Sequence, residues 1–142
     1  MKIAVFDGQG AGLGQSVIKA MRQSLPNPCT IVALGANTYA TSKMVRAGAS
    51  MGISGEKGFI SFCRREPIDC LIAPISIIES GSLHGEITRP MVHAFTDLHC
   101  KKFLIPLHHE RVFLPGLAHL PIKLCIEEII RQIHDDWAET DE

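Results

Sequence analysis

The segment Asp7–Gly14, "DGQGAGLG", holds four glycines in eight residues and decides the expected fold. A short apolar run, Ile3–Phe6, precedes it, and a buried strand is predicted over Lys2–Phe6. After the glycines, apolar residues recur at helical spacing as far as Leu25, which predicts a helix that begins near Leu13. A glycine-rich loop between a strand and a helix is typical of nucleotide-binding α/β proteins.

The rest of the chain repeats this alternation of strand and helix. Further strands are predicted over Thr30–Leu34, Ala49–Ile53, Asp69–Ala73 and Lys102–Leu107, with a short edge strand over Arg111–Leu114. Helices are predicted from about Thr41 to Gly48, between Ser54 and Pro67, from Thr88 to Leu98, and from Ile122 to Ile133, followed by an acidic tail over residues 135–142. The segment "GFISFC" also fits a strand, but a helix is favoured because parallel neighbours need a crossover. We expect one α/β domain over residues 1–142, a three-layer Rossmann-like open sheet, mostly parallel, of five or six strands.

Composition limits the classes of partner and compartment. The net charge of −1 gives no global reason to expect nucleic acid or a membrane surface as partner. The longest apolar run, Cys70–Ile78, is too short to cross a bilayer, and no signal peptide is visible. The five cysteines are scattered without a C-x-x-C pair, which suits reduced thiols. We therefore expect a cytoplasmic protein.

The glycine loop has two interpretations. Gly8, Gly12 and Gly14 fit the spacing G-x-x-x-G-x-G, and glycines of this kind let backbone N–H groups approach a phosphate closely. The positive end of the following helix points to the same place. The alternative is a tight turn between strand and helix that binds nothing.

Charge around the loop favours an anionic ligand. No acidic residue occurs between Asp7 and Glu56, whereas four basic residues do. Dinucleotide folds that prefer NAD place an acid near Asn37, so the sequence predicts a phosphorylated nucleotide cofactor, NADP(H) ahead of NAD. The predicted cofactor-binding residues are Asp7, Gly8, Gln9, Gly10, Gly12, Leu13, Gly14, Asn37, Thr38, Lys43 and Pro74. Alternatively, Asn37 and Thr38 simply cap the second helix.

The acid at the head of the loop complicates this prediction. The Asp7 carboxylate at the end of the first strand would repel a pyrophosphate nearby, unless the side chain turns aside. It could instead accept hydrogen bonds from the loop's own N–H groups, or share a Mg²⁺ with a phosphate. The sequence leaves these alternatives open.

The segment after the fourth strand, Pro74–Thr88 or "PISIIESGSLHGEIT", is the second candidate surface. It leaves the carboxyl end of a central strand, where open α/β sheets bind their ligands. His84 and Glu86 are the candidate catalytic residues, as an acid–base pair of a small-molecule enzyme. In the structural alternative, Ser82 and Thr88 shape turns and Glu86 favours a helix N-terminus.

The apolar part of the same segment, Ile75–Leu83, supports a third hypothesis, a non-catalytic regulatory protein that assembles through it. A homo-oligomer, a dimer by default, is expected for a small protein of this type. No metal site is expected, because adjacent residues such as His108 and His109 point to opposite faces of a strand.

Family resemblance covers nearly the whole chain. The first strand, glycine loop and helix resemble those of short-chain dehydrogenases and other Rossmann proteins, but the Tyr39–Lys43 segment "YATSK" stands too early for their catalytic pair. The ordered set "DGQGAGLG", "ALGANTYATSKMVRAGA", "SGEKG", "API", "GEIT" and "LIPL" resembles a small bacterial family, domain-of-unknown-function family 3842. That resemblance implies a single Rossmann-like domain and supplies no catalytic residue.

Overall fold

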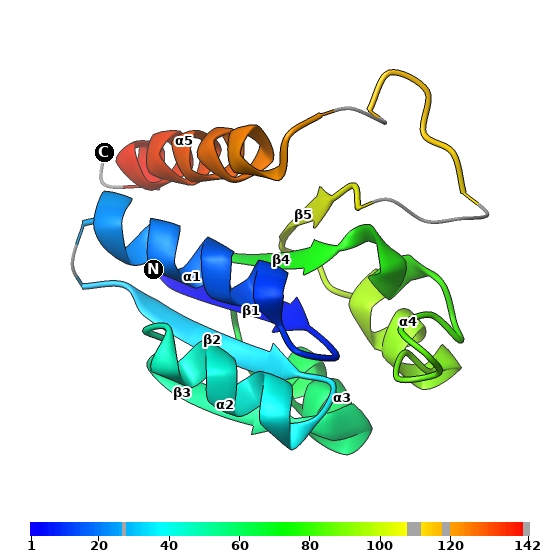
Figure 1. Ribbon diagram of the computed structural model, residues 1–142. Coiled ribbons are helices and arrows are strands. Elements are labelled where there is room, and N and C mark those ends of the chain that lie inside the picture. Colours follow the sequence, from blue (N-terminus) through cyan, green and yellow to red (C-terminus); the bar gives the residue numbers. More distant parts are fainter. Residues whose placement is uncertain (27, 108–111, 118–119, 141–142) are drawn as a thin grey trace.

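The computed structural model describes residues 1–26, 28–107, 112–117 and 120–140. Its centre is an open sheet in which all neighbouring strands pair in parallel, in the order β3-β2-β1-β4-β5 (Figure 1). The strands are β1 (Lys2–Asp7), β2 (Thr30–Gly35), β3 (Met51–Ser54), β4 (Cys70–Pro74) and β5 (Lys101–Ile105). The predicted Rossmann-like α/β architecture is confirmed.

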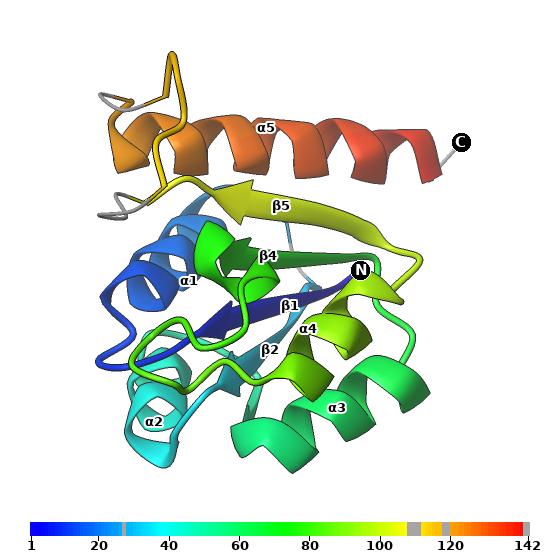
Figure 2. The same ribbon diagram turned by 90° about the vertical axis from the view of Figure 1, so that its right-hand side faces the viewer.

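Helices cover both faces of the sheet and produce three layers. The elements are α1 (Gly12–Ser24), α2 (Thr38–Arg46), α3 (Gly55–Arg65), the short 3₁₀ helix η1 (Ile75–Ile78), α4 (Arg89–Thr96) and α5 (Ile122–Thr140). The helices α1, α2 and α5 share one face, whereas α3 and α4 share the other (Figures 1 and 2). The segment "GFISFC" is therefore helical, as predicted.

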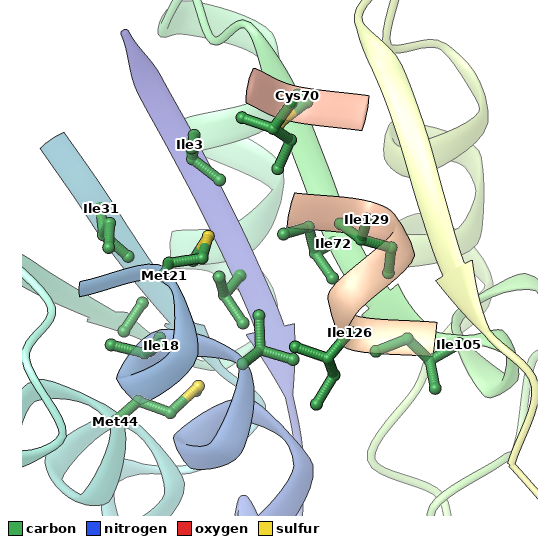
Figure 3. Packing of buried hydrophobic residues seen from close by; sticks show 14 of the residues in the cluster. Ile3, Ile18, Met21, Ile31, Met44, Cys70, Ile72, Ile105, Ile126 and Ile129 are labelled. Carbon is green, nitrogen blue, oxygen red and sulfur yellow. The ribbon is translucent and has the colours of Figure 1, made fainter. Parts of the chain in front are cut away.

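Two apolar cores lie on the two sides of the sheet, because side chains alternate between its faces. On one side, Ile3 and Val5 of β1 pack with Ile18 and Met21 of α1 and with isoleucines of α5, including Ile126 (Figure 3). This cluster fixes α1 and α5 side by side over the middle of the sheet.

On the opposite side, Ala4 and Phe6 of β1 pack under α3 and α4. The rings of Phe6 and Phe59 meet edge to face, with centroids 5.2 Å apart. Ile77 of η1 and Ile87, which precedes α4, are fully buried in this cluster. The segment that joins β4 to α4 is therefore anchored at both ends by packing.

The strand order places the expected ligand edge. The chain turns outward from β1 in both directions, toward β2 and toward β4, so the carboxyl ends of β1 and β4 form the topological switch point. Open α/β sheets bind ligands in the crevice outside this point. Here it is bordered by the β1–α1 loop and the segment 75–88 (Figure 2).

Several predicted boundaries differ from the structure. Helix α2 begins at Thr38 rather than near Thr41, because the Asn37 side chain accepts a hydrogen bond from the Ala40 N–H and starts the helix early. Within the described residues the sheet has five strands; Arg111 lies outside them, and residues 112–114 add no sixth.

The C-terminal segment also differs from its prediction. Residues 135–140 do not form a separate acidic tail but continue α5, whose apolar positions remain in register with the core. Residues 141 and 142 lie outside the described part of the chain. Among the helices that the structure describes, none is long and apolar enough to cross a membrane.

Candidate functional site

The Asp7 carboxylate lies inside the glycine loop and does not face an outside ligand. Its Oδ1 accepts a hydrogen bond from the Gly8 N–H and its Oδ2 from the Gly14 N–H, both at 2.8 Å. The residue is only 6% exposed. The sequence left several roles open for Asp7. The structure shows that its carboxylate accepts hydrogen bonds from the loop's own N–H groups, and thus holds the turn and ties the first turn of α1 to the end of β1.

Burial determines how Asp7 titrates. Loss of hydration raises the pKa of Asp7 above its ordinary value of 3.8. The two backbone N–H groups lower this pKa in part, and the nearby negative charge of Glu86 raises it further. Ionised Asp7 is therefore less stable in the folded chain than in the unfolded chain.

The shift predicts a pH dependence of stability. Because its folded pKa is raised, Asp7 binds its proton more tightly in the folded state, so its contribution to the free energy of unfolding is greatest below pH 3.8. That contribution is lost as the pH rises through the folded pKa. Urea unfolding at a series of pH values should show the stability of wild type falling, relative to Asp7→Asn, across this window. A difference that is constant with pH would contradict the assignment.

Glu86 joins three loops at the same edge of the sheet. Its Oε1 accepts a hydrogen bond from the Gln9 N–H at 2.8 Å, and its Oε2 accepts one from the Asn37 Nδ2 at 2.6 Å. The Asn37 Nδ2 also donates to the Gln9 carbonyl oxygen at 3.2 Å. The segment 75–88 is thus tied to the glycine loop and to the start of α2 by one carboxylate.

The glycines of the loop serve two purposes. A Cβ on Gly8 would lie 2.7 Å from Glu86 Oε1 and 2.8 Å from Leu83 Cδ1, and one on Gly14 would lie 2.5 Å from Met44 Sδ. These two glycines permit close packing. A Cβ on Gly10 or Gly12 would meet nothing within 4 Å, so these two face open space.

The backbone of the loop is strained at residues other than glycine. Gln9 and Ala11 have φ of 48° and 56°, whereas none of the loop's four glycines has a positive φ. A left-handed conformation costs a residue with a Cβ roughly 1–2 kcal/mol. Alternation of left- and right-handed residues turns successive N–H groups toward one side, which is how backbone concavities bind anions.

The N-terminus of α1 has free donors. Ala11 is the N-cap residue, and its side chain cannot accept a hydrogen bond from the helix. Within the described residues, the N–H groups of Gly10, Gly12 and Leu13 have no acceptor, whereas the Ala11 N–H donates to the Gly8 carbonyl oxygen at 2.9 Å. Three N–H groups at the positive end of a helix thus remain available to an anion.

The structure brings some of the predicted site residues together and separates others. Asp7, Gly8, Gln9, Gly14, Asn37 and Glu86 form one hydrogen-bonded or packed cluster. Thr38 is exposed as the first residue of α2, and Asn37 caps that helix, as the alternative interpretation held. Lys43 lies over the Tyr39 ring at 5.3 Å, and Pro74 is buried at the end of β4.

The proposed acid–base pair is not assembled in this structure. Both Glu86 oxygens are engaged with the glycine loop and Asn37, while His84 is exposed with a φ of 53°. A catalytic role for these two residues stays a prediction. His108, His109 and Glu110 lie outside the described residues.

Sequence reasoning missed two features of the site. The first is the partnership of Glu86 with Gln9, because 77 positions separate the two residues and no local pattern relates them. The second is the left-handed Ala11, whose residue type gives no signal of that conformation. The acid-free window from Gly8 to Gly55 also fails as an electrostatic guide, since folding carries Glu86 to the loop.

Comparison with known proteins gives a family and a fold. The profile of a family described as Domain of unknown function (DUF3842) matches residues 2–138. A comparison with curated proteins found no match. One similar solved structure is a dodecameric FMN-dependent UbiX-like decarboxylase from Escherichia coli O157:H7. It has a TM-score of 0.55 and 17% identity, over 97% of this chain and 95% of that one.

These findings correct the predicted cofactor. The prediction of NADP or NAD is wrong: the similar solved structure is described as FMN-dependent.

Proposed function

We propose that this chain, which belongs to the family described as Domain of unknown function (DUF3842), binds a phosphate-bearing ligand of the FMN type. The phosphate would lie at the tip of the glycine loop, on the N–H groups of Gly10, Gly12 and Leu13.

The observation that carries the proposal is the pair of glycines that the fold itself does not require. Gly10 and Gly12 have no positive φ, and a Cβ at either position would meet open space. Gly12 is the first residue of α1, and the absence of a Cβ there permits no close packing contact. Close approach of a ligand to the backbone explains both residues.

The residues present fit a single phosphate better than a pyrophosphate. The three free N–H groups and the uncapped end of α1 provide donors for one group at the tip. At the base of the loop, Asp7 is turned inward and Glu86 covers the Gln9 N–H. A phosphate at the tip would therefore lie beside the Glu86 carboxylate, whose charge opposes it.

The fold supports the flavin as the first ligand to test. The loop lies at the switch point between β1 and β4, where proteins of this architecture bind ligands. The FMN-dependent decarboxylase is similar along almost its whole length. When bound, a flavin supplies hydride and electron transfer, and this chain's residues would supply the phosphate donors and a carboxylate at the edge of the site.

Titration of the purified chain with FMN tests the proposal, followed by the change in flavin fluorescence. We expect saturable binding of one FMN per chain, and much weaker binding of riboflavin, which lacks the phosphate. Equal binding of both flavins, or binding of neither, would overturn the assignment of the loop tip to a phosphate.

Glu86→Ala should move ligand affinity and stability in opposite directions. Removal of a like charge beside the phosphate should tighten FMN binding about tenfold. Loss of the bonds to Gln9 and Asn37 should lower the free energy of unfolding by about 1–3 kcal/mol. Glu139→Ala, at an exposed position near the end of α5, is the matched control. An unchanged FMN affinity in Glu86→Ala would show that the phosphate does not lie near this carboxylate.

The structure weakens the hypothesis that the chain assembles through the apolar side chains of Ile75–Leu83. Ile77 is fully buried, and Leu83 packs toward Gly8, so Ile78 is the main apolar side chain that this segment exposes, at 52%. We nonetheless propose a homo-oligomer, in line with the dodecameric state in the description of the similar structure.

A further inference from the structure

A hollow of about 660 Å³ lies between α1 and α5 and is lined by residues of both helices. Ala20, Ile126 and Ile130 are its less exposed apolar residues. Polar and charged residues of both helices surround them. None of the lining residues belongs to the glycine loop, so this face takes no part in the proposed ligand site.

A row of alternating charge borders the hollow along α5. Lys123, Glu127, Arg131 and Asp135 follow each other at intervals of four residues, so they form one ridge of the helix. All four side chains are exposed, and none forms an ion pair with another described residue. Four charges on one surface ridge thus remain without partners inside the described chain.

The order of these charges is self-complementary. If a second copy of the ridge lies antiparallel to the first about a two-fold axis at its midpoint, Lys123 meets the partner's Asp135. In the same arrangement, Glu127 meets the partner's Arg131, and symmetry repeats both pairs. A parallel arrangement in the same register would place like charges opposite each other. The sequence of signs therefore selects one arrangement of two identical chains.

Apolar side chains lie beside the charged ridge, on the side of α1. Ile122 is 40% exposed and Ile130 is partly exposed, whereas Ile126 is buried in the protein's own core. Two accessible isoleucines thus flank the charges. We propose that this face binds a second copy of this chain, with the two α5 helices antiparallel and the charged ridges paired.

Charge reversal and charge exchange test this interface through the oligomeric state. Arg131→Glu places Glu127 opposite a glutamate, twice by symmetry, and we expect the dissociation constant of the dimer to rise about tenfold to hundredfold. The double variant Glu127→Arg/Arg131→Glu restores opposite charges only if the two positions face each other across a two-fold axis. Sedimentation velocity at low salt, over a range of protein concentrations, measures both effects.

The second pair, Lys123 with the partner's Asp135, allows an independent test in case a variant at Glu127 or Arg131 does not fold. Lys123→Glu should weaken the dimer, and Lys123→Glu/Asp135→Lys should restore it, with folding checked by circular dichroism. A monomeric wild type, a dimer insensitive to both reversals, or reversals that the exchanges do not rescue would each overturn the proposal. Recovery of the dimer in both exchange variants would support the proposal, because each exchange restores opposite charges only between two copies of this chain.

Discussion

Gly12→Asp is expected to abolish FMN binding while it stabilises the protein. The aspartate would place a carboxylate beside the free N–H groups of the α1 N-terminus, where it would take the place of the phosphate and repel it. We expect a loss of affinity of at least about a hundredfold, which corresponds to about 3 kcal/mol. Fluorescence titration with FMN measures this loss.

The stability of the same variant should change in the opposite direction. An acid in the first turn interacts favourably with the helix dipole, and the replacement of glycine removes an entropic cost, so we expect a gain of about 1 kcal/mol in the free energy of unfolding. Ser16→Asp adds the same charge one turn later on α1 and should retain FMN binding. Unchanged FMN affinity in Gly12→Asp would contradict the ligand site.

Gly35→Ala is expected to give the largest loss of stability. Gly35 ends β2 and pairs with Asp7, and a Cβ there would overlap the Thr41 Oγ1 and lie 2.6 Å from the Thr41 backbone nitrogen. Because the backbone of α2 cannot yield as a side chain can, the helix would have to move away from the sheet. We expect the free energy of unfolding to fall by about 2–3 kcal/mol.

A matched substitution separates this clash from the general effect of alanine. Gly10→Ala adds the same methyl group where a Cβ meets nothing within 4 Å and φ is not positive. Its effect should remain within about 0.5 kcal/mol. Urea unfolding of both variants measures the difference, and equal stabilities would show that β2 and α2 do not approach each other as closely as described.

The fold was largely predictable because the chain repeats a local pattern. Buried strands such as β1 contain continuous apolar runs, here Ile3–Phe6, and the helices carry apolar residues at helical spacing. Boundaries were less predictable. The start of α2 depends on which side chain caps it, and the length of α5 depends on packing that extends beyond its isoleucines.

The site was predictable in place but not in detail. The position of a glycine loop after β1 indicates the ligand edge from sequence alone. The roles within it depend on contacts between distant segments. Asp7 turns inward because two loop N–H groups face it, and Glu86 arrives from a segment 77 positions after Gln9. The Asp7 contact was among the alternatives that the sequence left open, because the carboxylate and the N–H groups belong to one loop. The Glu86 contact leaves no periodic or local signal, so the sequence did not place a second carboxylate at this loop.

The most direct test of the account follows the amide resonances of the loop while FMN is added. In two-dimensional ¹H–¹⁵N spectra, we predict that the largest shifts occur at Gly10, Gly12 and Leu13, the three residues whose N–H groups lack an acceptor within the described chain. The Gly8 and Gly14 amides, held by Asp7, should change much less. Shifts confined to other parts of the chain, or no shifts at all, would contradict the claim that the tip of this loop binds a phosphate.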